Sequence, residues 1–289
     1  MYKILKKPFL GKYMEKWREP IIREEKHKWI PFETKNRSGS VLKGLYHETP
    51  GARGCIVLGH PLGREAKGFF LKRGYHRFLI ANRYNVVVFD FNGFGESGNG
   101  NFNYPGDIHT MGFFVKERFP SLPIGYLGIS MGAAWGVCAF SKPGHVYSAA
   151  IFDSCFTTLD EFWGKDQYTY VWLKVIGAIL PETKKRLTPV RKIGSLKNFK
   201  KVGFICSLED ELTPIDMTLR LREKCNVFSD LFVVNDSRHS ESYLNDPEGY
   251  QLFVLNYFEE QFTNQISSNS REPLFRTPGM KIVSSQNSI

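Results

Sequence analysis

The stretch Gly128-Ile129-Ser130-Met131-Gly132 decides the fold of this 289-residue chain. It directly follows the apolar run 124–127 and directly precedes residues 133–137, which are compatible with a helix. A strand that turns abruptly into a helix holds a serine in a strained conformation, and flanking glycines let the two backbones pass closely. We therefore interpret Ser130 as a nucleophile presented at a strand-to-helix turn.

The sequence around this turn alternates between apolar runs and connections long enough for a helix. Six apolar runs follow one another, at residues 55–60, 86–91, 124–129, 149–153, 202–207 and 231–235. This pattern is typical of a parallel sheet that is buried on both faces. Two earlier runs, 29–34 and 41–47, are joined by a turn at 36–39 and predict an antiparallel opening.

The fold class predicted from this pattern is α/β, with a mostly parallel eight-stranded sheet and helices on both faces. Helical spacing predicts one helix near residues 72–83 and a final helix within 241–262, so the domain spans 29–262. Residues 156–200 exceed what one crossover helix needs and are rich in aromatic side chains, which predicts a small helical cap. Residues 1–28 are interpreted as a basic extension, and residues 263–289 are expected to form a disordered tail.

A nucleophilic serine needs a base, and for this type of turn the chain order is serine, then acid, then histidine. Of the seven histidines, only His239 follows a candidate acid placed late in the predicted sheet. It lies in a loop after the last apolar run, where its side chain can reach over the carboxyl edge of the sheet. We therefore assign His239 as the general base.

The acid is expected in residues 207–214, which follow a predicted strand and contain three carboxylates. Asp210 is our choice, because a buried carboxylate on the imidazole fixes its tautomer and stabilises the imidazolium. Glu209 and Glu211 are interpreted as solvated neighbours. Asp153 also ends a predicted strand and is the alternative acid.

Two backbone amides are candidates for an oxyanion hole. Met131 opens the predicted helix, where its N–H can donate to a developing oxyanion. The second donor is expected in the loop His60-Pro61-Leu62-Gly63; because Pro61 has no N–H, we assign the Leu62 amide. His60 is expected to shape this loop rather than to react.

A second glycine-rich stretch, at residues 93–98, matches the dinucleotide-binding pattern G-x-G-x-x-G after a strand. The residues that follow, 99–105, cannot open a helix at the required point, and no acidic strand end follows about 20 residues on. We therefore exclude a nucleotide site and interpret the stretch as a turn anchored by Asp90.

The cysteines and the charge restrict the location and the partners. Five scattered cysteines without a C-x-x-C pair indicate neither a disulfide framework nor a zinc site, which favours a cytoplasmic location. No apolar run is long enough to cross a membrane, and residues 1–8 do not resemble a secretion signal.

The net charge of +10 is concentrated in residues 1–28 and 181–201. We interpret both segments as solvated surface, expect no nucleic-acid partner, and keep residues 1–28 as a candidate for peripheral membrane contact.

Over residues 29–262 the sequence resembles α/β-hydrolases of the esterase, thioesterase and serine-peptidase type. The resemblance is carried by the oxyanion loop 60–63, the turn 90–97, the stretch 128–132, and Asp210 with His239. Asn92 stands where the family usually has arginine, and Pro61 and Ser207 each replace a common glycine. The segment from Asp153 to residue 159 is similar to one in microbial members related to eukaryotic membrane-associated hydrolases, which implies a structural role for Asp153.

The resemblance implies an acyl-enzyme on Ser130 that forms from a small-molecule ester, thioester or amide and needs no metal or organic cofactor. Two alternatives remain open. One is a catalytically silent fold that serves as a binding or membrane-associated scaffold, and the other is an acyltransferase that uses the same triad. The sequence does not define the oligomeric state.

Overall fold

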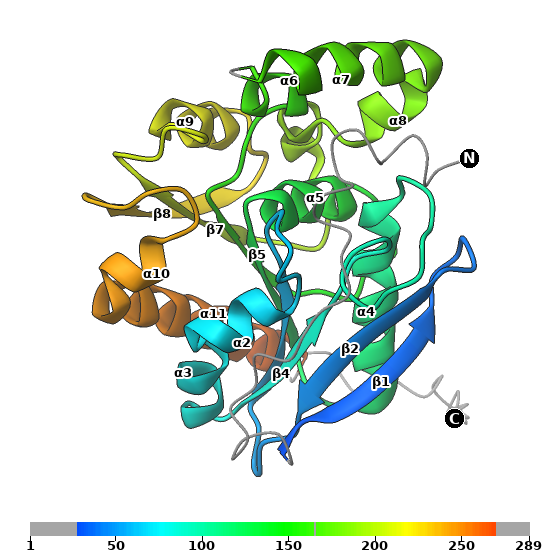
Figure 1. Ribbon diagram of the computed structural model, residues 1–289. Helices are drawn as coiled ribbons and strands as arrows, with labels where there is room; N and C mark the ends of the chain where they lie inside the picture. Colours follow the sequence, from blue (N-terminus) through cyan, green and yellow to red (C-terminus); the bar gives the residue numbers. More distant parts are fainter. Residues whose placement is uncertain (1–27, 165, 270–289) are drawn as a thin grey trace, which may run out of the picture.

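A single mixed sheet of eight strands forms the centre of the molecule (Figure 1). The computed structural model describes residues 28–164 and 166–269, with side chains described up to residue 263. The strand order is β1-β2-β4-β3-β5-β6-β7-β8; β1 and β2, and β2 and β4, pair antiparallel, and all other neighbours pair parallel. The strands are β1 (Ile30–Lys35), β2 (Val41–His47), β3 (Gly54–Gly59), β4 (Tyr84–Phe89), β5 (Ile124–Ile129), β6 (Ala149–Asp153), β7 (Lys201–Ser207) and β8 (Phe228–Val234).

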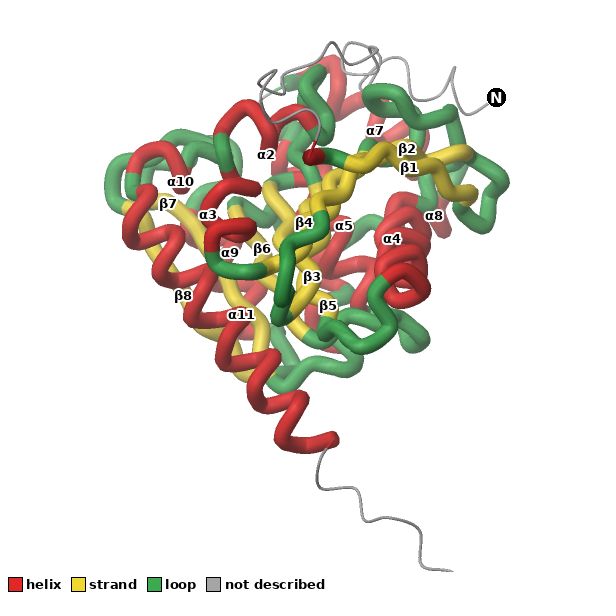
Figure 2. The backbone as a smooth tube through the Cα atoms, turned by 90° about the horizontal axis from the view of Figure 1, so that it is seen from below, coloured by secondary structure: helices red, strands yellow, loops and turns green. Residues whose placement is uncertain are grey.

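Helices cover both faces of this sheet, as Figure 2 shows. The helices α4 (Tyr104–Arg118), α5 (Met131–Phe140) and α9 (Ile215–Glu223) contribute to one hydrophobic core. The helices α2 (Gly68–Arg73), α3 (Tyr75–Ala81) and α11 (Pro247–Asn269) contribute to the other core, and the short α10 (Ser242–Asn245) precedes α11. The predicted α/β class with a mostly parallel sheet is therefore confirmed.

Strand β3 shows why the apolar runs carry no polar alternation. Val57 packs into the core of α4 and α5, whereas Ile56 and Leu58 pack into the core of α2, α3 and α11. Successive side chains of a strand point to opposite faces, so a strand between two helical layers needs apolar residues at every position. The uninterrupted apolar pattern therefore indicates that helices cover both faces of the sheet.

The predicted cap region contains three helices, which lie above α5 at the top of the view in Figure 1. They are α6 (Leu159–Phe162), α7 (Gln167–Ile179) and α8 (Pro181–Arg186), followed by the 3₁₀ turns η3 (Pro189–Arg191) and η4 (Ile193–Ser195). The Thr158 and Asp166 side chains accept hydrogen bonds from the first-turn amides of α6 and α7, which fixes where each helix begins. An ion pair between Arg220 on α9 and Glu161 on α6 joins the cap to the body.

Two element boundaries differ from the sequence-based expectation. The helix expected near residues 72–83 corresponds to α3, whereas α2 before it was not expected; Gly74, in a left-handed conformation (φ 80°), separates the two helices. Helix α11 begins at Pro247 and continues to Asn269, past the expected start of a disordered tail at residue 263. The rest of that predicted tail and most of the basic extension 1–28 lie outside the described residues. None of the described helices has the length and apolar character needed to cross a bilayer.

Candidate active site

Ser130 lies at the sharp turn between β5 and α5. Its backbone has φ 52° and ψ −112°, a conformation that non-glycine residues rarely adopt, and its side chain is buried. The Ser130 N–H donates to the carbonyl of Asp153 at 2.8 Å, which ties the turn to the end of the neighbouring strand β6. The strained turn and its support are the geometry that the G-x-S-x-G stretch predicts.

The flanking glycine Gly132 makes this turn possible. A Cβ atom on Gly132 would lie 2.0 Å from the carbonyl oxygen of Gly59, so only glycine allows α5 to begin beside the end of β3. This contact places the first residue of α5, Met131, next to the loop that begins at His60. The two amides assigned to the oxyanion hole thereby come from adjacent segments.

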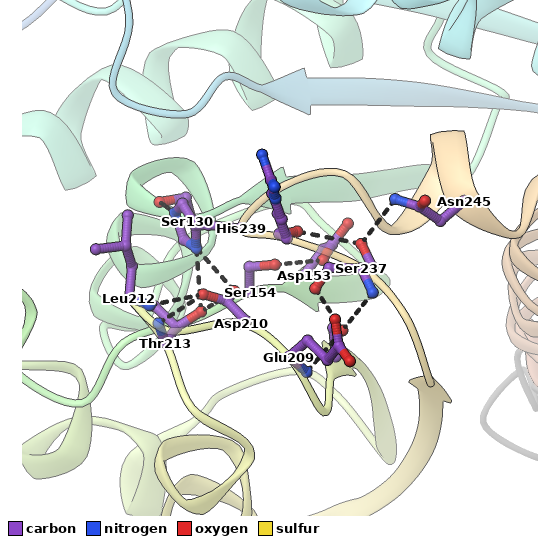
Figure 3. A network of polar contacts seen from close by, with 12 residues as sticks. Ser130, Asp153, Ser154, Glu209, Asp210, Leu212, Thr213, Ser237, His239 and Asn245 are labelled. Carbon is purple, nitrogen blue, oxygen red and sulfur yellow. Dashed lines mark hydrogen bonds and ion pairs between the residues drawn. The ribbon is translucent and has the colours of Figure 1, made fainter.

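Three side chains from separate loops form a continuous hydrogen-bonded chain (Figure 3). The distance from Ser130 Oγ to His239 Nε2 is 2.7 Å, and that from His239 Nδ1 to Asp210 Oδ2 is 2.8 Å. With Nδ1–H donating to the carboxylate, Nε2 is left as the acceptor for the serine hydroxyl. The Phe162 ring of the cap lies 5.6 Å from the His239 ring, between centroids.

The surroundings of Asp210 favour its ionised form. Burial acts to raise the pKa of this carboxyl, but hydrogen bonds from His239 and Thr213 outweigh burial and hold the pKa below its usual value. Oδ1 accepts from the Leu212 and Thr213 amides at 2.9 and 2.8 Å, and Oδ2 accepts from Thr213 Oγ1 at 2.5 Å. Asp210 is therefore a fixed negative charge beside the imidazole.

The carboxyl group of Asp153, the alternative acid, accepts hydrogen bonds from Ser154 and Tyr250 rather than from His239. Its Oδ1 accepts from Ser154 Oγ at 2.9 Å and its Oδ2 accepts from the Tyr250 hydroxyl at 3.0 Å. Burial raises the pKa of Asp153 to about 7, although the Ser154 and Tyr250 hydrogen bonds and His239 oppose that rise. Of the two aspartates, Asp210 makes the hydrogen bond to His239 Nδ1.

The loop that carries Leu62 is held rigidly from both ends. His60 is fully buried; its Nδ1 lies 2.8 Å from the Pro61 carbonyl, and its Nε2 accepts from the Phe91 amide at 3.1 Å. Burial lowers the pKa of His60 to about 4, so the imidazole is neutral at neutral pH. The role expected for His60, shaping the loop, agrees with these contacts.

At the other end of this loop Lys67, itself buried, contacts Asp90. The Lys67 amide donates to Asp90 Oδ1 at 2.9 Å and its ammonium donates to Asp90 Oδ2 at 2.6 Å. Asp90 Oδ2 also accepts from the Glu96 amide at 2.9 Å, within the glycine-rich stretch 93–98. The helix α4 opens only at Tyr104, so this stretch is a turn anchored by Asp90 rather than a phosphate loop.

A cavity of about 470 Å³ lies between the body and the cap, within the size range of small-ligand sites. Leu62 and Met131, the two residues assigned to the oxyanion hole, both line it. The remaining wall is mainly apolar and comes from α5, the start of α4 with the loop before it, and the cap. It includes Tyr104, Trp135, Phe156, Phe162, Leu173 and Ile176. Such a surface suits an apolar ligand group near Met131, the residue that directly follows Ser130.

Sequence reasoning missed two supporting residues, Ser207 and Thr213. Ser207 Oγ donates to the Ser237 carbonyl at 2.6 Å and accepts from the Ser237 amide at 3.1 Å, so it joins the acid loop to the histidine loop. Its replacement of a common glycine was the available signal. Thr213, three residues after Asp210, gave no such signal, because its role depends on how the loop folds back. No cluster of His, Cys, Asp or Glu able to hold a metal occurs in residues 28–164 and 166–269.

Comparison with solved structures identifies the fold. The esterase Pf2001 of Pyrococcus furiosus matches with a TM-score of 0.70 and 18% identity over 86% of this chain and 97% of that chain. Acetyl xylan esterase 1 of Thermoanaerobacterium matches with a TM-score of 0.62 and 12% identity, over 81% of this chain and 83% of that chain. The acylaminoacyl peptidase of Pyrococcus horikoshii matches with a TM-score of 0.58 and 15% identity, over 90% of this chain and 44% of that chain. No protein-family model and no curated protein sequence matches. The chain therefore has the α/β-hydrolase fold.

Proposed function

We propose that this protein is a serine hydrolase that cleaves a carboxylic ester, thioester or amide through an acyl-enzyme on Ser130. The observation that carries the proposal is the unbroken hydrogen-bonded chain from Ser130 through His239 to Asp210, on a strained turn at the end of a central strand. Solved structures with the same fold include proteins described as esterases and an acylaminoacyl peptidase, which supports a hydrolase reading.

The reaction begins when Ser130 Oγ attacks the carbonyl carbon and its proton passes to His239 Nε2. The Leu62 and Met131 amides donate to the oxygen that becomes negative, and Asp210 stabilises the imidazolium that forms. His239 then gives the proton to the leaving alcohol, thiol or amine, and the C–O, C–S or C–N bond breaks. Water, deprotonated by His239, attacks the acyl-enzyme and releases the acid while Ser130 regains its proton.

The substrate we propose is a small molecule with an apolar acyl or aryl group, because the cavity beside Leu62 and Met131 is mainly apolar. The proposed location remains the cytoplasm, since all five cysteines are free thiols and four of them are buried. The reaction described above uses only side chains and amides of this chain.

The test is labelling by a fluorophosphonate probe at neutral pH, compared between the wild-type protein, Ser130→Ala and His239→Ala. We expect covalent labelling of the wild type only, read as a mass increase on the peptide that contains Ser130. A folded wild-type protein that stays unlabelled would overturn the proposal and favour the silent scaffold.

Labelling does not distinguish hydrolysis from acyl transfer, because both use the same acyl-enzyme. The deciding measurement is the product of a labelled acyl ester with and without added alcohols, amines and thiols. We expect free acid as the main product in every mixture; a product in which the acyl group has moved to an acceptor would assign the protein as an acyltransferase.

A further inference from the structure

The cap helix α7 has two apolar faces that point in different directions. One face carries Thr169, Leu173 and Ile176, which are buried, and the last two line the cavity. The other face carries four exposed apolar side chains, which we call the α7 stripe: Tyr168, Val171, Val175 and Ile179, exposed by 66%, 57%, 40% and 60%. Among the residues that the structure describes, packing explains only the first face.

The spacing makes the α7 stripe a continuous surface. Positions 168, 171, 175 and 179 are separated by three, four and four residues, so their side chains lie along one side of the helix. Scattered exposed apolar residues are normal on a protein, but a contiguous row of large ones marks a surface that contacts a membrane or another protein. In Figure 1 helix α7 runs along the outer edge of the molecule, at the top of the view.

The cap segment that contains the stripe carries a net positive charge. Residues 156–200 contain nine Lys and Arg against four Asp and Glu. Ion pairs join Lys184 to Asp160 and Lys185 to Glu182, so two of the carboxylates are already neutralised. The charge balance of the cap therefore favours an anionic partner.

Three cations, Lys142, Arg186 and Lys192, lie near one another at the C-terminal end of α8. Burial lowers the pKa of Lys142, and the nearby charges of Arg186 and Lys192 lower this pKa further. The three cations are therefore close enough to repel one another, and a negatively charged surface would relieve that repulsion.

We propose that the α7 stripe docks on an anionic lipid membrane, with the basic residues of the cap close to the headgroups. A one-helix apolar row flanked by cations is the pattern of helices that lie in the membrane interface. A second copy of this chain would bring two basic caps together, and the segment 1–27 is itself basic, so charge disfavours both as occupants. The α7 stripe consists of other residues than the basic extension 1–28, which the sequence made a candidate for membrane contact.

This docking would join the membrane to the cavity through one helix. Because the opposite face of α7 lines the cavity, an amphiphilic acyl compound leaving the bilayer would enter beside Leu173 and Ile176. That consequence rests on the proposed function, whereas the docking itself does not.

The test is sedimentation of the full-length protein with vesicles of phosphatidylglycerol and phosphatidylcholine, or of phosphatidylcholine alone. We expect binding to the anionic vesicles only, and binding about tenfold or more weaker for Val171→Ser/Ile179→Ser. Ser has nearly the same helix propensity as Val and Ile, so α7 should keep its helix. Circular dichroism and turnover of a water-soluble short ester check that the variant is folded and that its basal activity is unchanged.

The matched control is Phe228→Ser/Leu252→Ser, which removes two apolar side chains that are also exposed, by 83% and 62%, away from the cap. We expect this control to bind anionic vesicles as the wild type does.

Equal binding of the stripe variant and the control, or equal binding of the wild type to both vesicle types, would overturn the proposal. A dimer that dissociates in the stripe variant, without vesicle binding by the wild type, would also overturn it and assign the stripe to a second copy. Loss of vesicle binding with retained fluorophosphonate labelling keeps this proposal separate from the catalytic one.

Discussion

Two aspartates at the ends of neighbouring strands, Asp153 after β6 and Asp210 after β7, differ in what surrounds their carboxyl groups. Asp210 accepts hydrogen bonds from two amides, a hydroxyl and His239, which keep it ionised. Asp153 accepts only from hydroxyls and is fully buried, which raises its pKa to about 7. The surroundings, rather than the position in the sequence, therefore decide which carboxylate can serve the imidazole.

Replacing each aspartate by asparagine should separate these roles. For Asp210→Asn we expect kcat/KM to fall about 10³–10⁴-fold, because the amide no longer fixes the imidazole tautomer or stabilises the imidazolium. For Asp153→Asn we expect a fall of less than about tenfold, since Asp153 makes no hydrogen bond to His239 in this structure. Hydrolysis of a short p-nitrophenyl ester measures both, and a larger loss for Asp153→Asn would reverse the assignment.

The raised pKa of Asp153 also predicts how stability depends on pH. In the unfolded chain the carboxyl has a pKa of about 4, whereas burial raises its pKa to about 7 in the fold. The stability associated with the protonated group is full below the unfolded pKa and is lost as pH rises through the folded pKa. From about pH 5 to about pH 8 the wild type should therefore lose on the order of a few kcal/mol more free energy of unfolding than Asp153→Asn does. Urea unfolding at the two pH values measures this, and parallel losses in both proteins would contradict it.

The loop between β3 and α2 shows how one connection is held in place at the level of elements. His60 fixes its beginning through the Phe91 amide, and Lys67 fixes its end through the Asp90 carboxylate. Both anchors lie in or next to the turn that follows β4. The position of the Leu62 amide thus depends on a neighbouring strand end.

Breaking the Lys67–Asp90 pair should therefore be costly. For Lys67→Met we expect the free energy of unfolding to fall by about 3–5 kcal/mol, because Asp90 keeps a buried charge without its ammonium partner. The control is Lys72→Met, which removes an exposed lysine paired with Glu65 and should cost about 1 kcal/mol or less. Denaturant unfolding compares the two, and similar losses would show that Lys67 is not a structural anchor.

The cap gives the whole molecule its enclosed cavity. Tyr104 and Trp135 of the body line the cavity on one side, and residues of α6, α7 and α8 line it on the other. Helix α7 contributes Leu173 and Ile176 to the cavity with one face and presents the α7 stripe with the other. Substrate size and the proposed membrane contact therefore depend on the same helix.

Narrowing the cavity should change which acyl chains are accepted. Each added CH₂ that becomes buried favours binding by about 0.8 kcal/mol, or about fourfold in kcat/KM, until the cavity is full. We expect Ile176→Trp to stop this rise at a shorter chain while acetyl ester turnover is retained, because Ile176 lines the cavity. Ile179→Trp, on the exposed face of the same helix, should leave the chain-length profile unchanged. Kinetics with a series of p-nitrophenyl esters is the measurement, and equal profiles for the two variants would place the acyl group elsewhere.

Much of the fold could be predicted, because local patterns of apolar residues indicate where the strands lie and which faces are covered. The apolar runs of β3 to β8 and the antiparallel opening were recognisable, since a strand between two helical layers has no polar alternation. The helix α2 was missed, because the sequence does not reveal that Gly74 is left-handed and separates one more helix from α3. The extent of α11 was missed for a related reason, since polar composition past residue 262 does not end a helix by itself.

For the site, Ser130, His239 and the sheet that carries them were predictable, because chain order and the G-x-S-x-G context are local properties. It left Asp153 as an alternative to Asp210, and it did not reveal Ser207 as the link between two loops. The tertiary structure decided which carboxylate reaches the imidazole and what encloses the cavity. The physical reason is that hydrogen bonds and burial depend on which loops meet at the sheet edge, and residues far apart in the chain meet there only after folding.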